Sequence, residues 1–158
     1  MNIAVDLQNL LAEKLELLLN FERLTELLTE CDVSAMNDYI TKRRELANRI
    51  DIITDNILIL CDKADITPCA RDIIANKCDF SDVCDEWQPV FTLSQSILAC
   101  VNRCIEVNDL AYSRMQALKN HFEKRIKETN NTPKIIRYLS ASGAKIPGGD
   151  ISIKNMKI

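Results

Sequence analysis

Residues 89–129 read PVFTLSQSILACVNRCIEVNDLAYSRMQALKNHFEKRIKET and hold no glycine and, after Pro89, no proline. Mainly apolar side chains recur there at alternating intervals of three and four residues, the spacing of one face of an α-helix. They are Val90, Leu93, Ile97, Val101, Cys104, Asn108, Ala111, Met115, Leu118 and Phe122. At about 1.5 Å per residue, this helix would be roughly 60 Å long. Such a rod must bury its stripe along other helices, which the rest of the chain is expected to supply.

Turn-forming residues are scarce before the end of the chain. All three glycines (Gly143, Gly148, Gly149) lie within the last sixteen of the 158 residues. Because folds with many strands need tight turns throughout, this distribution favours an all-α protein. We expect an elongated antiparallel hairpin or bundle with coiled-coil-like seams and a flexible C-terminal tail.

Two helices are predicted ahead of the long one, over residues 3–31 and about 35–62, with Ser34 as the N-cap of the second. Their short connection predicts an antiparallel hairpin. The first stripe consists of Ile3, Leu7, Leu10, Leu17, Phe21, Leu24, Leu28 and Cys31, interrupted at Lys14 and widened by Leu11, Leu15, Leu18 and Leu27. The second consists of Met36, Tyr39, Arg43, Leu46, Ile50, Ile53, Ile57 and Leu60.

The middle of the chain is predicted to be short helices. Thr67-Pro68 resembles an N-cap followed by proline in the first helical position. Residues 79–88 (DFSDVCDEWQ) would form either a second short helix or a kinked continuation, with Phe80, Val83, Cys84 and Trp87 on one face.

The long helix is expected to end near Asn130-Asn131, because Thr132-Pro133 repeats the cap-and-proline signal. A short amphipathic segment over 134–142 would follow, ending at Gly143, and then an aperiodic tail. The predicted domains are therefore a helical bundle, 1–131, and a segment with a basic, disordered tail, 132–158.

Charge is distributed unevenly. Residues 1–113 hold 20 acidic and 10 basic side chains, whereas residues 114–158 hold 3 and 10. The basic residues form no run, so we expect this end to pack on an acidic surface rather than on nucleic acid. The N-terminus lacks the pattern of a signal peptide, and no apolar run approaches the ~20 residues of a membrane span. A cytoplasmic protein with reduced cysteines is expected.

No catalytic site, metal or cofactor is predicted. His121 is the single histidine, and there is no glycine-rich phosphate loop. Cys100 and Cys104 share a helix face and could form a zinc site with Cys78 and Cys84. Their spacing is not that of a zinc knuckle, however, and cysteine also serves as a small apolar residue.

Asn108 is a polar residue in the long apolar stripe. A buried asparagine in such a seam fixes register or partner number at a cost in stability. Alternatively, the helix rotates slightly and Val107 packs in its place.

The chain resembles the FlgN family of bacterial flagellar export chaperones in three stretches. Residues 10–57 (LLAEKLELLLNFERLTELLTECDVSAMNDYITKRRELANRIDIITDNI) resemble that family's leucine-rich first helix, short break and second helix. Asn108 in EVND resembles its asparagine-bearing stretch, although Ala111 stands where a second asparagine is expected. Residues 138–143 (YLSASG) resemble its tyrosine-to-glycine tail.

The resemblance implies a noncatalytic chaperone for hook-filament junction proteins, which it would deliver to the export apparatus. Client binding or docking would then involve Ile135, Ile136, Tyr138 and Leu139. Apart from the resemblance, helix-in-groove binding of an amphipathic client is the leading interpretation of the stripes. The alternative is a coiled-coil scaffold or adaptor that self-associates, for instance as a homodimer.

Overall fold

The computed structural model describes residues 2–141, with side chains as far as Lys134 and at Arg137. Every regular element in this range is an α-helix or a 3-10 turn, so the all-α prediction is confirmed. Residues 142–158 lie outside the described residues, and with them the predicted tail and the expected helix end at Gly143. None of the described helices is both long enough and apolar enough to span a membrane.

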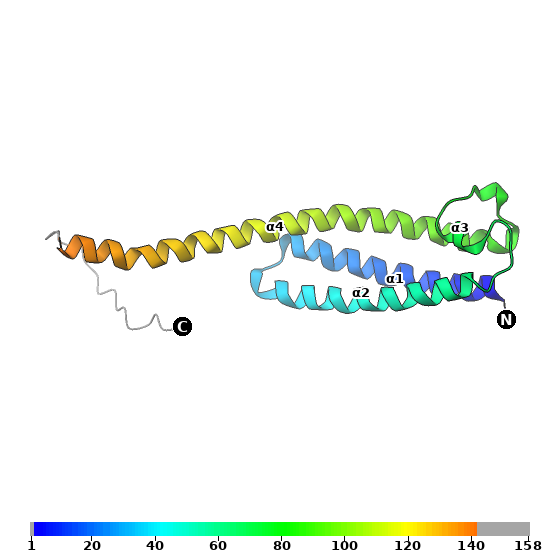
Figure 1. Cartoon of the computed structure of the whole chain (residues 1–158), viewed down its shortest axis with the longest axis horizontal. Helices are drawn as coiled ribbons and strands as arrows, with labels where there is room; N and C mark the ends of the chain where they lie inside the picture. The colour runs from blue at the N-terminus through cyan, green and yellow to red at the C-terminus, as the bar shows by residue number, and fades with distance from the viewer. Residues whose placement is uncertain (1, 142–158) are drawn as a thin grey trace. The chain divides into compact units, whose positions relative to one another are not determined.

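The predicted N-terminal hairpin is present. Helix α1 spans Ile3–Glu30 and helix α2 spans Val33–Cys61, and the two lie side by side (Figure 1). The side chain of Asn2 caps α1 by accepting a hydrogen bond from the backbone N–H of Val5 at 3.3 Å. The expected N-cap at Ser34 is wrong by two residues, because α2 already begins after Asp32.

Apolar burial holds this hairpin together. Leu7 and Leu28 on α1 and Ile57 on α2 are almost completely buried. At about 1.5–3 kcal/mol for each large apolar side chain removed from water, such residues outweigh weak local helix propensity. Leu24, a predicted stripe position, is only half-buried, because it lines a surface groove between α1 and α2.

The segment that connects the hairpin to the long helix differs from its prediction. Helix α3 spans Ala70–Ile74 and follows Cys69, not Thr67. Residues 79–88 form two separate 3-10 turns, η1 (Phe80–Asp82) and η2 (Asp85–Trp87), instead of a helix. Val83 and Cys84 lie in extended backbone between the two turns, so their side chains point to opposite sides. Val83 therefore enters the core, as Trp87 does, while Cys84 and Phe80 stay exposed.

Helix α4 spans Gln88–Ala141. The predicted break near Asn130 is wrong, because Pro133 lies inside the helix. Proline removes one backbone hydrogen bond from a helix interior, but the surrounding turns keep theirs. The Thr132 side chain does not act as a cap, because its hydroxyl donates back to the carbonyl of Glu128 at 2.9 Å.

By its internal contacts the chain divides into two compact units, Met1–Arg114 and Met115–Ile158. The first unit contains α1, α2, α3, both 3-10 turns and α4 as far as Arg114. The second contains the remainder of α4. The core of the first unit is built from α1, the C-terminal half of α2, α3 and the start of α4.

Candidate helix-binding groove

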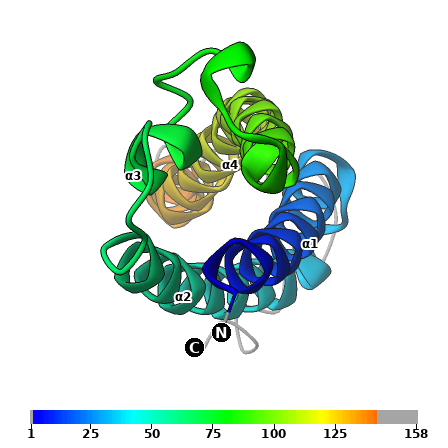
Figure 2. The ribbon, with the colours of Figure 1, turned by 90° about the vertical axis from the view of Figure 1, so that its right-hand side faces the viewer.

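In the first unit, α1, α2 and the beginning of α4 lie around one axis, and α3 fills the side between α2 and α4 at one end (Figure 2). Arg71 on α3 donates to Asp62, the C-cap residue of α2, with an Nη2–Oδ2 distance of 2.8 Å. The Asn76 amide, just after α3, donates to the carbonyl of Ser94 on α4 at 3.5 Å. α3 therefore acts as a short fourth helix at this end of the unit.

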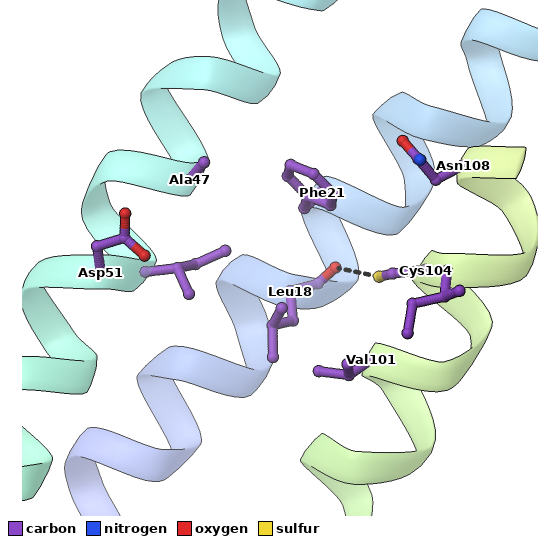
Figure 3. A pocket seen from close by; sticks show the side chains of 9 residues that line it. Leu18, Phe21, Ala47, Asp51, Val101, Cys104 and Asn108 are labelled. Atoms are coloured by element: carbon purple, nitrogen blue, oxygen red, sulfur yellow. Dashed lines mark hydrogen bonds between the residues drawn. The ribbon is translucent and has the colours of Figure 1, made fainter. Parts of the chain in front are cut away.

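Farther along the same side, a groove of about 340 Å³ opens between α2 and α4. Figure 3 shows side chains of α1, α2 and α4 converging on it. Its lining is mainly apolar and comprises Leu18, Phe21, Ala47, Ile50, Asp51, Val101, Cys104, Ile105 and Asn108. No described helix covers this stretch as α3 covers the other end. Apolar grooves between helices bind small ligands or the anchor side chains of a further helix.

Helix α4 contributes two apolar faces to this unit. One face is buried against the core and consists of Val90, Ile97, Cys100, Cys104 and Ala111, with Ile97 only partly covered. The other consists of Leu98, Val101 and Ile105, and of these Val101 and Ile105 line the groove. Leu98 is 43% and Ile105 56% exposed. A helix that packs against a single neighbour needs one apolar face, so the second face is available to another helix.

Arg43 and Asn108 connect α2 to α4 at the groove. Nη2 of Arg43 donates to Oδ1 of Asn108 at 2.9 Å, and the guanidinium lies 4.5 Å from the centre of the Phe21 ring. Burial lowers the pKa of Arg43, and its Nε is buried without an acceptor among the described residues. Asn108 itself is exposed, while Val107 is half-buried. Asn108 thus provides a polar link at the surface of the groove.

A polar cluster lies between α1 and α4 behind the groove. The carboxylate of Glu22, 8% exposed, accepts from Nε of Arg103 at 2.7 Å and from Nη2 at 3.1 Å. These hydrogen bonds lower the pKa of Glu22. The Cys100 thiol donates to the same carboxylate at 3.5 Å, and burial raises the pKa of Cys100 to about 12. The carboxylate is therefore charged at neutral pH while the thiol is protonated.

Glu22, Cys100 and Cys104 are the described residues that come close enough to hold a metal ion, with ligand atoms within 4.8 Å of one another. Cys78 and Cys84 do not join them, so the four-cysteine alternative does not match the structure. Metal binding would require both thiols to lose their protons. It would also require a carboxylate oxygen of Glu22 to bind the metal in place of a hydrogen bond from Arg103. The present contacts of the cluster are those of an ion pair between a buried carboxylate and a half-exposed guanidinium.

The predicted docking residues Ile135, Ile136, Tyr138 and Leu139 lie in α4 by their backbone, but their side chains are outside the described part of the chain. Helix-in-groove binding was predicted from the stripes, but the position of this groove was not. Its signal was the second row of apolar residues beside the main stripe, namely Leu98 and Ile105 next to Val101. No protein-family model matches the chain, and neither a curated protein nor a solved structure matches it significantly.

Proposed function

We propose that this protein is a noncatalytic cytoplasmic chaperone that binds an amphipathic helix of a client protein. The observation that carries the proposal is the groove between α2 and α4, into which the exposed Ile105 of α4 faces. A client helix placed there would continue along the side that α3 occupies at the other end. It would cover the second apolar face of α4, whose exposure costs free energy as long as it stays in water.

The client class follows from the resemblance in sequence. Flagellar hook-filament junction proteins, held in the cytoplasm before type III export, are the proposed clients. Ile135, Ile136 and Leu139 would add a second contact to the client, and Tyr138 would dock at the export apparatus. These four assignments depend on the resemblance of the tail. The groove assignment depends instead on the exposure of Ile105 and on the apolar side chains that line the groove.

The groove can be tested with synthetic helices from the termini of junction proteins, labelled for fluorescence anisotropy. Ile105→Glu places a charge among apolar lining residues and should weaken binding at least tenfold. Ile52→Glu is the matched control, because Ile52 is 62% exposed on α2 and does not line the groove. Circular dichroism should show equal helicity for both variants. Equal affinity of the two variants would refute the groove assignment.

The tail assignment is tested separately. Tyr138→Ala should leave client affinity in the anisotropy experiment within twofold of the parent protein and reduce capture of the export apparatus in a pull-down. If Tyr138→Ala lowered helicity strongly instead, Tyr138 would be a structural residue and the docking role would be wrong.

A self-associating scaffold is the second candidate, and a specific observation favours it. In the second unit, Phe122 is 44% and Ile126 59% exposed on α4. A scaffold would bury these residues between copies and form particles that grow with concentration. A chaperone would instead bind junction-protein helices with a fixed stoichiometry, which the same anisotropy titration measures.

A further inference from the structure

The second unit carries an exposed apolar row of its own. Along α4, Leu118, Phe122 and Ile126 follow one another at intervals of four residues and therefore share a face of the helix. Leu118 is half-buried, and the other two are exposed. A single helix in water is marginally stable by its propensity alone, so an apolar row of this kind is stabilised when another surface covers it.

Basic side chains flank this row. At 100° per residue, Lys119 and Arg125 lie on opposite sides of the line through Phe122 and Ile126. Residues 115–137 contain six basic side chains (Lys119, Lys124, Arg125, Lys127, Lys134, Arg137) and two acidic ones (Glu123, Glu128). Oε1 of Glu123, one of the two acidic residues, lies 4.0 Å from Nζ of Lys119 on the same helix. The row therefore fits an apolar groove with acidic borders.

The groove of the first unit has such borders. Asp51 lines it on α2, and Asp55 is one turn farther along the same helix. On α4, Glu106 and Asp109 follow the lining residue Ile105, and all four carboxylates are exposed. Arg43, whose guanidinium is bonded to Asn108, and the exposed Arg44 are the basic residues on this flank of α2, and Lys14 of α1 interacts with Asp51. Acidic groups predominate where a docked helix would place its own charged side chains.

We propose that two copies of this chain bind each other reciprocally, with the basic apolar row around Phe122 of each copy in the α2–α4 groove of the other. Because each copy would supply a row to the other and accept a row from it, the proposed assembly is a closed two-fold dimer and not an open chain. Pairing the basic rows of two copies with each other is disfavoured, because it would bring Lys119 and Arg125 next to like charges. Opposite charges also accelerate association and select the partner.

If the groove also binds clients, dimerisation and client binding exclude each other. This competition rests on the proposed function: the dimer would be a storage form, and a client would release the monomer by occupying the groove. The dimer itself does not require that any client exists, so its test uses the protein alone.

The test is the molar mass of the full chain in solution, measured by light scattering at low ionic strength. The expected mass is twice the 18.0 kDa of the monomer. Ile105→Glu should halve the measured mass, and so should Phe122→Glu on the other side of the same contact. Ile52→Glu should remain a dimer. A monomeric parent protein would overturn the proposal, and so would a dimer that both Ile105→Glu and Phe122→Glu leave intact.

Charge reversal distinguishes this contact from any other dimer. One variant carries Asp55→Lys, Glu106→Lys and Asp109→Lys at the groove, and the other carries Lys119→Glu and Arg125→Glu on the row. Each should be monomeric alone, because its groove and row then have the same sign. An equimolar mixture should recover the doubled mass, since both contacts become complementary again. A mixture that stays monomeric would overturn the proposal while leaving the client-binding result of Ile105→Glu unaffected.

Discussion

Arg103 on α4 donates two hydrogen bonds to the buried carboxylate of Glu22 on α1, at 2.7 and 3.1 Å. This pair fixes how the two helices face each other in the first unit, because a planar guanidinium accepts few orientations against a carboxylate. Just beside it, Cys104 contacts the Leu18 carbonyl at 3.9 Å, which Figure 3 shows as a dashed line. The pair thereby supports the wall of the groove.

Replacing Arg103 should destabilise the fold through Glu22. Arg103→Met leaves a buried carboxylate without its principal partner, so the urea midpoint should fall. Adding Glu22→Gln should recover part of the loss, since a neutral amide is easier to bury. Urea unfolding of the parent, both single variants and the double variant gives the coupling between the two residues. A coupling of zero would mean that the pair contributes nothing to stability.

The same pair predicts a response to acid. Because the pKa of Glu22 in the folded protein lies below its ordinary value of 4.5, the pair stabilises the fold above that value. Stability should fall as the pH drops through the lowered pKa of Glu22. Unfolding midpoints measured from pH 6 downward should therefore decline more steeply for the parent than for Glu22→Gln.

Arg114 should stabilise the end of α1. Its guanidinium donates to the carbonyl of Leu28 at 2.7 Å and also to that of Cys31, both at the helix C-terminus, where carbonyls lack partners within the helix. Arg114→Met should cost about 1.5–3 kcal/mol, the range for hydrogen bonds to a charged group. Arg49→Met, at an exposed position of α2, should cost less than about 0.5 kcal/mol. Thermal melts should therefore show a larger fall in the unfolding midpoint for Arg114→Met than for the control variant.

Leu28 should be among the most sensitive positions of the hairpin. It is completely buried, so Leu28→Ala should reduce the free energy of unfolding by about 2–5 kcal/mol. Leu19→Ala is the control on the same helix, because Leu19 is 46% exposed and leaves no cavity. Similar losses for both would show that α1 does not bury the face described above.

The buried thiols should make the fold sensitive to alkali. The pKa of Cys100 rises to about 12 and that of Cys61 to about 11 because burial disfavours the thiolate. The unfolded chain ionises near 9.0, so stability is full below that pH and declines as the pH rises towards these values. Cys100→Ala should weaken the decline, whereas Cys69→Ala, at an exposed thiol, should not. Unfolding midpoints between pH 8 and 11 test this.

The long helix illustrates how far the sequence pattern reaches. Its start near Pro89 and its apolar alternation were predicted, because they depend on local spacing and on the absence of glycine. Its continuation through Pro133 was not predicted, because a proline in a helix interior loses a backbone hydrogen bond and the local pattern therefore indicates a helix end. The 3-10 turns around Val83 were also missed, since their geometry follows from the way Val83 and Trp87 reach the core of the first unit.

The candidate site was predictable only in part. Asn108 is recognisable in the sequence as a polar residue in an apolar stripe. Its hydrogen-bond partner Arg43 is not recognisable as such, because it lies 65 positions away in the chain. Nothing in the sequence distinguishes Glu22 from the other acidic residues of α1. Only the approach of α4 to α1 places it beside Arg103 and two thiols.

By itself the sequence determined that this chain is helical, that residues 3 to about 62 form a hairpin and that basic residues gather towards its end. These properties follow from periodicity, turn residues and composition, each of which acts over a few residues. The tertiary structure decided that α3 covers only one end of the α2–α4 side and that a groove remains beyond it. The groove lies between helices that are distant in sequence. Its position depends on how far each helix extends alongside the others, which a local sequence pattern does not specify.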